Sequence, residues 1–164
     1  MSMIRMKIFM LTLFFATSVY AQDSTSAYKN YFGFSGSRVS GVGLTFGTEP
    51  TPIINLQFTG GIFRTSSNSF FSYGFELQYN LHNTNGYRIY LGPAMGGFNE
   101  GNELGTVREN TTSEFVIGLA MGAATPLSGI FGQRLGASAT FYYPTFYKDN
   151  SIGVGFGATI HFRF

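Results

Sequence analysis

The chain has 164 residues, which is enough for one domain. Ten Lys and Arg stand against eight Asp and Glu, and two of the basic residues, Arg5 and Lys7, lie close to the N-terminus, so the rest of the chain is formally neutral. Charged residues make up only 11%, which indicates no basic face for binding nucleic acid. The absence of cysteine excludes disulfides, thiolate metal sites and cysteine nucleophiles. An aromatic content of 18% with 22 glycines is too apolar for intrinsic disorder.

The first 21 residues have the layout of a secretory signal peptide. Arg5 and Lys7 form a basic start, residues 8–15 form an apolar run, and a stretch ending in Ala21 provides the exit. We expect cleavage after Ala21 and a short periplasmic segment at residues 22–27. The alternative is an uncleaved membrane anchor, which is disfavoured because polar residues interrupt the run and a spanning helix needs about 20 apolar residues.

From residue 28 onward, bulky apolar residues alternate with small or polar ones. Residues 152–164 carry Ile, Val, Ala and Phe at even positions, and three Gly followed by Thr159, His161 and Arg163 at odd positions. This period of two predicts β-strands with two different faces. The small-residue face almost lacks the Lys and Glu that face water in a soluble barrel. We therefore expect the bulky face to meet lipid and the small face to line a narrow lumen.

The alternation predicts an all-β fold, a transmembrane antiparallel up-and-down β-barrel of eight strands that forms one domain over residues 28–164. The predicted strands are 28–35, 39–48, 52–63, 69–82, 87–98, 112–124, 130–146 and 151–164. Residues 28–48 fit either one strand or a hairpin with an odd-length loop at residues 36–38. We favour the hairpin because closed single-chain bacterial barrels have an even number of strands.

The predicted connections differ in length between the two ends of the barrel. Compact turns at residues 48–52, 84–86 and 125–129 would lie with both termini on the periplasmic side. The longest connection, residues 99–111, is polar and would be extracellular. It is our candidate for recognition of a surface partner, with a solvated tether as the alternative. Its charged candidates are Glu100, Glu103, Arg108 and Glu109.

With its leader ending in Val19-Tyr20-Ala21, its alternating strands and a terminal segment Ile160-His161-Phe162-Arg163-Phe164, the chain resembles the small eight-stranded outer-membrane β-barrel proteins of Gram-negative bacteria. The resemblance covers roughly residues 28–164. It implies location in the bacterial outer membrane, in contact with outer-membrane lipid. It also implies that Ile160, Phe162 and Phe164 act as the signal read by the barrel-assembly machinery. The family includes adhesins, structural proteins and lipid-modifying enzymes, so membership indicates location more firmly than role.

Polar residues on the small face predict a hydrogen-bonded network inside the barrel. Eight strands leave a bore that side chains can fill, so packing is favoured over passage of a solute. Glu76 is the acid placed deepest within a strand, and we expect it to need an arginine partner. The predicted network consists of Asn55, Gln57, Glu76, Gln78, Arg88, Tyr90, Arg134, His161 and Arg163.

The sequence predicts no catalytic, cofactor or metal site. His161 or His82 could serve as a general base for a nearby serine, but no carboxylate is spaced to orient either ring. The favoured function is a non-enzymatic outer-membrane protein with a mostly plugged lumen and an envelope-structural or surface-interaction role. The rivals are a narrow pore for small solutes, a lipid-modifying enzyme and a secreted soluble barrel that carries an apolar ligand.

Overall fold

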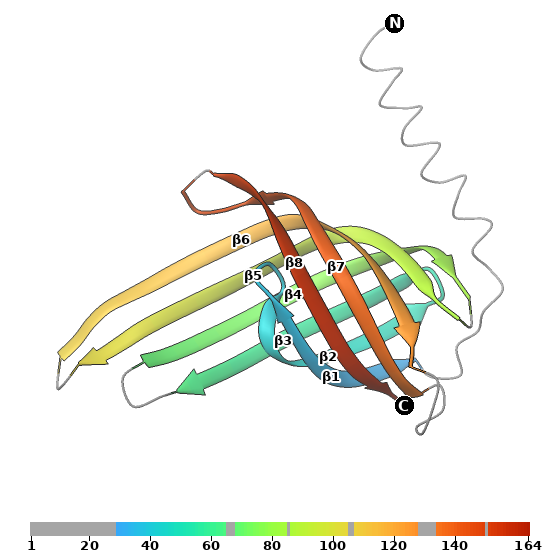
Figure 1. The fold of residues 1–164 in the computed structure, drawn as a ribbon, viewed down its shortest axis with the longest axis horizontal. Helices are drawn as coiled ribbons and strands as arrows, with labels where there is room; N and C mark the ends of the chain where they lie inside the picture. Colours follow the sequence, from blue (N-terminus) through green and yellow to red (C-terminus); the bar gives the residue numbers. More distant parts are fainter. Residues whose placement is uncertain (1–28, 65–67, 85, 105–106, 128–133, 150) are drawn as a thin grey trace, which may run out of the picture.

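A computed structural model describes residues 29–64, 68–84, 86–104, 107–127, 134–149 and 151–164. The expected leader and the segment at residues 22–27 lie outside the described residues. Eight antiparallel strands follow one another around a closed barrel, each paired with its neighbours in sequence, and β1 pairs with β8 (Figure 1). The strands are β1 (Asn30–Ser37), β2 (Gly41–Thr51), β3 (Ile54–Arg64), β4 (Asn68–Asn83), β5 (Arg88–Leu104), β6 (Val107–Pro126), β7 (Leu135–Phe146) and β8 (Ile152–Arg163). The predicted fold class is confirmed.

The first two strands form the expected hairpin. Three residues separate β1 from β2, and the register pairs Phe32 with Phe46 and Phe34 with Leu44. A connection of odd length keeps the even positions of both strands on one face, as the sequence requires. The connection lies at residues 38–40, two positions later than predicted.

The barrel wall is apolar on its outer face and polar on its inner face, which is the reverse of a soluble protein. Large apolar side chains such as Phe34, Leu44 and Phe156 are half or more exposed on the outside. The most buried polar side chains, which include Asn55 and Gln78, are at most 1% exposed and point inward. This arrangement is suited to an apolar surrounding and a polar interior.

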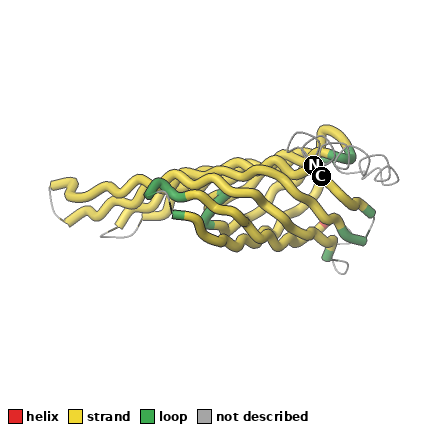
Figure 2. Tube along the Cα trace, turned by 90° about the horizontal axis from the view of Figure 1, so that it is seen from above, coloured by secondary structure: helices red, strands yellow, loops and turns green. Residues whose placement is uncertain are grey.

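Four strands continue beyond the rest of the barrel at the end opposite the C-terminus (Figure 2). β5 extends to Leu104 and β6 starts at Val107, and the two remain paired as far as Leu104 with Val107. The expectation of a loop at residues 99–111 is therefore wrong. Bulky and small residues cease to alternate in this stretch, whereas the backbone ladder continues because it needs no apolar residues.

The extension is a four-stranded sheet, β3–β6, which we call the protruding sheet. β2 pairs with β3 only as far as Leu44 with Gly60, and β7 pairs with β6 only from Phe146 with Ile117. Among the described strands, nothing pairs with residues 61–64 of β3 or with residues 107–116 of β6 on their outer sides. The protruding sheet therefore has two free edges.

Candidate functional site

The connection between β1 and β2 folds into the barrel instead of rising above it. Val39 and Ser40 are completely buried. Gly41 and Gly43 have φ values of 92° and 139°, which side-chain-bearing residues rarely adopt, and they turn the chain inward. We call residues 38–43 the inward hairpin.

Five inward-facing glycines, on five different strands, make room for the inward hairpin. A Cβ on Gly74 would lie 2.1 Å from the carbonyl oxygen of Ser40, and one on Gly96 would lie 2.3 Å from that of Val39. Both distances are far below van der Waals contact, so no larger residue fits without movement of the backbone. The row consists of Gly61 on β3, Gly74 on β4, Gly96 on β5, Gly118 on β6 and Gly155 on β8.

Hydrogen bonds attach the inward hairpin to the barrel wall. Ser37 Oγ accepts from the backbone N–H groups of Val39 (3.0 Å) and Ser40 (3.1 Å). Ser72 Oγ on β4 accepts from the N–H of Val42 at 3.1 Å and donates to its carbonyl at 2.5 Å. Ser40 Oγ and the Tyr142 hydroxyl share a hydrogen bond of 2.8 Å. Hydrogen bonds thereby join the hairpin to the end of β1 and to β4 and β7 on the barrel wall.

Glu76 lies beneath the inward hairpin and is 1% exposed. Its Oε2 accepts from the Tyr142 hydroxyl at 2.9 Å, and its Oε1 accepts from Gln78 Nε2 at 2.7 Å. Among the described residues it forms no ion pair, so the expected arginine partner is replaced by two neutral donors. The polar groups of the hairpin therefore connect through Tyr142 to this carboxyl.

Arg88 forms its ion pair with Glu49 and not with Glu76. Arg88 Nη1 lies 2.8 Å from Glu49 Oε1, and Nη2 donates to Gln78 Oε1 at 2.9 Å. Glu49 is 7% exposed and was missed because the sequence assigned it to a turn. A signal was present, since Glu49 continues the inward parity of Thr45 and Gly47 on β2.

Tyr31 connects three of the predicted network residues although the sequence did not single it out. Its hydroxyl donates to Gln57 Oε1 at 3.1 Å and accepts from Asn55 Nδ2 at 3.0 Å. Asn55 Nδ2 also donates to Gln78 Oε1. The Tyr31 ring packs on His161 with centroids 4.6 Å apart.

The other predicted network residues lie in different surroundings. The Tyr90 hydroxyl hydrogen-bonds Thr140 Oγ1 at 2.6 Å. Arg163, half-buried, lies with its Nε 3.5 Å from His161 Nε2. The inward placement of Arg134 is wrong, because β7 starts one residue later and Arg134 is exposed outside the strand. β7 begins at Leu135, five residues after the predicted start at residue 130.

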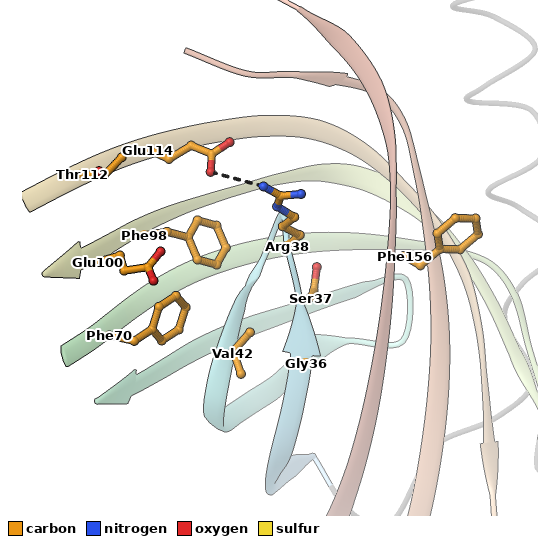
Figure 3. A pocket seen from close by; sticks show the side chains of 10 residues that line it. All are labelled: Gly36, Ser37, Arg38, Val42, Phe70, Phe98, Glu100, Thr112, Glu114 and Phe156. Atoms are coloured by element: carbon orange, nitrogen blue, oxygen red, sulfur yellow. Dashed lines mark ion pairs between the residues drawn. The ribbon is translucent and has the colours of Figure 1, made fainter. Parts of the chain in front are cut away.

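A cavity of about 360 Å³, which we call the outer cavity, lies beside the inward hairpin and next to the protruding sheet (Figure 3). The hairpin contributes Arg38 and Val42, and the strands contribute Phe70, Phe98, Glu100 and Glu114. The rings of Phe70 and Phe98 are 6.2 Å apart. Arg38 Nη2 lies 4.0 Å from Glu114 Oε2.

The remaining predicted site residues are located as follows. Glu103 and Arg108 face each other in the β5–β6 register, and Glu109 lies opposite Asn102, while their side chains fall outside the described part. Ile160 and Phe162 are exposed on the outer face of β8, paired with Phe34 and Phe32. Phe164 follows β8, and its N–H donates to the Asn30 carbonyl at 2.9 Å.

The fold is that of an eight-stranded antiparallel closed β-barrel with a polar interior. The crystal structure of the N-terminal beta-barrel domain of Pseudomonas aeruginosa OprF is similar, with a TM-score of 0.52 and 14% sequence identity over 82% of this chain and 96% of that one. A likeness at this identity concerns the fold.

No family model and no curated protein matches the sequence. The described residues contain no helix long and apolar enough to cross a bilayer, and no group of three or more His, Asp or Glu side chains arranged to hold a metal ion.

Proposed function

We propose that this protein is a non-enzymatic integral outer-membrane β-barrel with a mostly plugged lumen that presents a sheet at the cell surface for interaction with a partner. One observation carries the proposal: the outer wall is apolar while the interior is polar. Side chains such as Ile160 and Leu44, each 59% exposed, would cost free energy in water and gain it in lipid.

The proposed plug consists of the inward hairpin and the side chains beneath it. Hydrogen bonds run from Ser40 through Tyr142, Glu76, Gln78 and Arg88 to Glu49. An eight-stranded barrel has an interior that side chains can fill, so these side chains would leave no bore for a solute under this proposal. The pore hypothesis is disfavoured on this ground.

The protruding sheet supports the surface-interaction role. Among the described strands, none pairs with the outer side of residues 107–116 of β6, where Lys148 Nζ donates to the Ser113 carbonyl at 3.5 Å. An extended segment of a partner protein could pair with this edge as an added strand. Because the proposed recognition uses backbone groups, it needs no particular side chain. We therefore expect a partner to bind the edge of β6 and not a loop at residues 99–111.

The enzyme hypothesis finds little support around the two histidines. Within the described residues, the hydrogen bond recorded for His161 comes from Arg163, and the ring packs on Tyr31. His82 stacks on Tyr87 with centroids 4.9 Å apart. In the part of the chain that the structure describes, neither ring has a hydrogen-bonded carboxylate and hydroxyl, the pair that a nucleophilic mechanism needs.

Export through a cleaved signal peptide and insertion by the barrel-assembly machinery complete the proposal. The exposed, outward positions of Ile160 and Phe162 on the last strand leave both side chains accessible to such a receptor. Phe164 lies at the end of the same strand.

Two measurements test the proposal. Outer-membrane fractions run unboiled and boiled on a gel should show a band that shifts on heating, as closed membrane barrels do. In planar bilayers, the purified protein should give no steady single-channel steps. Recovery as a soluble periplasmic protein would overturn the location, and regular steps would overturn the plug in favour of the narrow pore.

A further inference from the structure

The barrel wall is interrupted where the inward hairpin leaves it. β1 and β8 pair only as far as Ser37 with Gly157, although β8 extends to Ile152. β2 rejoins β3 only at Leu44 with Gly60, although β3 extends to Arg64. Among the described strands, nothing closes the wall between residues 152–156 and residues 61–64. The hairpin that fills the interior therefore leaves an opening in the side of the barrel.

The outer cavity connects this opening with the interior. Gly36 and Phe156 line it where β1 leaves β8, and both face outward, with Phe156 69% exposed. Phe70 and Phe98 line the same cavity from the inward faces of β4 and β5. In Figure 3 the Phe156 side chain points away from these two rings, on the far side of the hairpin. One cavity is thus bounded by both faces of the wall.

The inner lining of the outer cavity is largely apolar and continues the buried apolar cluster that contains Val39, Ala94 and Val116. Phe98 follows Ala94 and Gly96 on the inward face of β5 and is 8% exposed. Phe70 stands on the inward face of β4, which otherwise carries Ser72, Glu76 and other small or polar residues. A volume of about 360 Å³ lies within the range of small-ligand sites. This lining is suited to a hydrocarbon chain.

Charges of both signs stand at the rim of the outer cavity. Arg38 and Glu114 are only loosely paired at 4.0 Å, and the Arg38 side chain is 74% exposed. Glu100 adds a second, exposed carboxylate. One guanidinium with two carboxylates complements a headgroup that carries a phosphate and an ammonium group.

We propose that the outer cavity binds a single-chain zwitterionic amphiphile, whose hydrocarbon chain enters from the membrane through the interrupted wall. The phosphate pairs with Arg38, the ammonium group pairs with Glu100 and Glu114, and the chain packs on Phe70 and Phe98. The inference rests on the proposed function, because a barrel embedded in lipid brings hydrocarbon chains to this opening.

Tryptophan fluorescence provides the test, because the chain contains no tryptophan. Phe98→Trp places a single reporter in the outer cavity, and Tyr73→Trp places one at a neighbouring position of the wall on its outer face, since Tyr73 pairs with Gly97. Each variant in lipid nanodiscs is titrated with lysophosphatidylcholine brominated on its acyl chain. We expect saturable quenching of the reporter at position 98, and quenching at position 73 that rises in proportion to the probe.

The headgroup contacts are tested in the Phe98→Trp background. Arg38→Ala should weaken binding of the brominated lysophosphatidylcholine by about three- to tenfold, because it removes one charge-assisted contact. Lys29→Ala is the matched control, since Lys29 is another exposed cation that does not line the outer cavity and precedes Asn30, which hydrogen-bonds the C-terminal Phe164 at the opposite end of the barrel. It should leave the affinity unchanged.

Failure of the site and failure of the proposed function give different results. If brominated bilayer phospholipid does not quench Tyr73→Trp, the barrel is not in the membrane and the proposed function fails. If that quenching occurs while the reporter at position 98 shows none that saturates, the site alone is overturned. Equal effects of Arg38→Ala and Lys29→Ala would overturn the headgroup assignment.

Discussion

At the scale of single residues, Glu76 determines how the interior is connected. Its carboxyl is the acceptor shared by Tyr142, which contacts the inward hairpin, and Gln78, which contacts Arg88. Removing it leaves two buried donors without an acceptor. Such a donor costs about 1–3 kcal/mol when left unpaired.

We predict that Glu76→Ala lowers the free energy of unfolding by about 2–4 kcal/mol, because both the Tyr142 hydroxyl and Gln78 Nε2 lose their acceptor. Glu76→Gln should cost much less, since its amide oxygen still accepts and the Tyr142 hydroxyl can accept from its amide nitrogen. Urea unfolding in lipid vesicles, followed by the heat-dependent gel shift, measures both. Equal losses in the two variants would contradict the acceptor role.

At the scale of structural elements, the inward hairpin depends on glycines in strands that it does not adjoin in sequence. Gly74 and Gly96 belong to β4 and β5. Because neither has a side chain, residues 39–41 can lie inside the barrel. The hairpin and its glycines therefore form one unit. A larger residue at one of these wall glycines should therefore displace the inward hairpin.

We predict that Gly74→Ala displaces the inward hairpin, since its Cβ would lie 2.1 Å from the Ser40 carbonyl oxygen. Gly60→Ala is the control, because the nearest atom to its Cβ outside the adjoining residues would be the Ser72 carbonyl oxygen, 3.9 Å away. Trypsin cleavage after Arg38 should become at least several-fold faster in Gly74→Ala and stay unchanged in Gly60→Ala. If Gly74→Ala is cleaved at the wild-type rate, the hairpin does not rely on this glycine.

The free edge of β6 gives a second prediction at this scale. Residues 117–126 lie between β5 and β7, whereas residues 107–116 pair with β5 alone. Backbone amides that point to the free side should exchange with solvent. Hydrogen exchange measured by NMR should therefore alternate between fast and slow along residues 107–116 and be uniformly slow along residues 117–126. Uniform protection in both segments would contradict the free edge.

The sequence predicted these elements unevenly, and the reason is physical. Strands such as β8 were predicted because the outer and inner faces of the barrel wall carry different side chains at alternate positions. Residues 99–111 were misread because bulky and small residues cease to alternate there, while the backbone pairing of β5 with β6 continues. The inward hairpin was not foreseen, since Val39 and Ser40 show no pattern, and the glycines that accommodate it were attributed to the narrowness of the barrel. Glu49 was missed although its parity was right.

At the scale of the whole molecule, the apolar wall and the protruding sheet divide the surface into two environments. The position of the boundary between the two environments can be tested with residues on the outer face of β6. Leu119 and Ser113 both face outward on β6, six positions apart, and Leu119 lies where β7 covers the edge of β6 while Ser113 lies beyond it. Only the first should contact hydrocarbon.

We predict that Leu119→Arg reduces stability in the bilayer by about 2–4 kcal/mol, the cost of an arginine facing lipid near the midplane. Ser113→Arg should have an effect within about 1 kcal/mol, because the side chain would lie in water or headgroups. The folded fraction after insertion into vesicles measures both. Equal effects would mean that the protruding sheet is immersed in lipid as deeply as the wall.

The pairing of β1 with β8 has a consequence for the order of assembly. Thr159 hydrogen-bonds Ser35 across 124 positions of sequence, so the barrel can close only after the last strand has been made. The inward hairpin contacts β3, β4 and β5 much earlier in the chain, and it can lodge there while the sheet is still open. The sheet can then curve around the inward hairpin, which already lies against its concave face. The hairpin would thus act as a template for the curvature of the strands that follow.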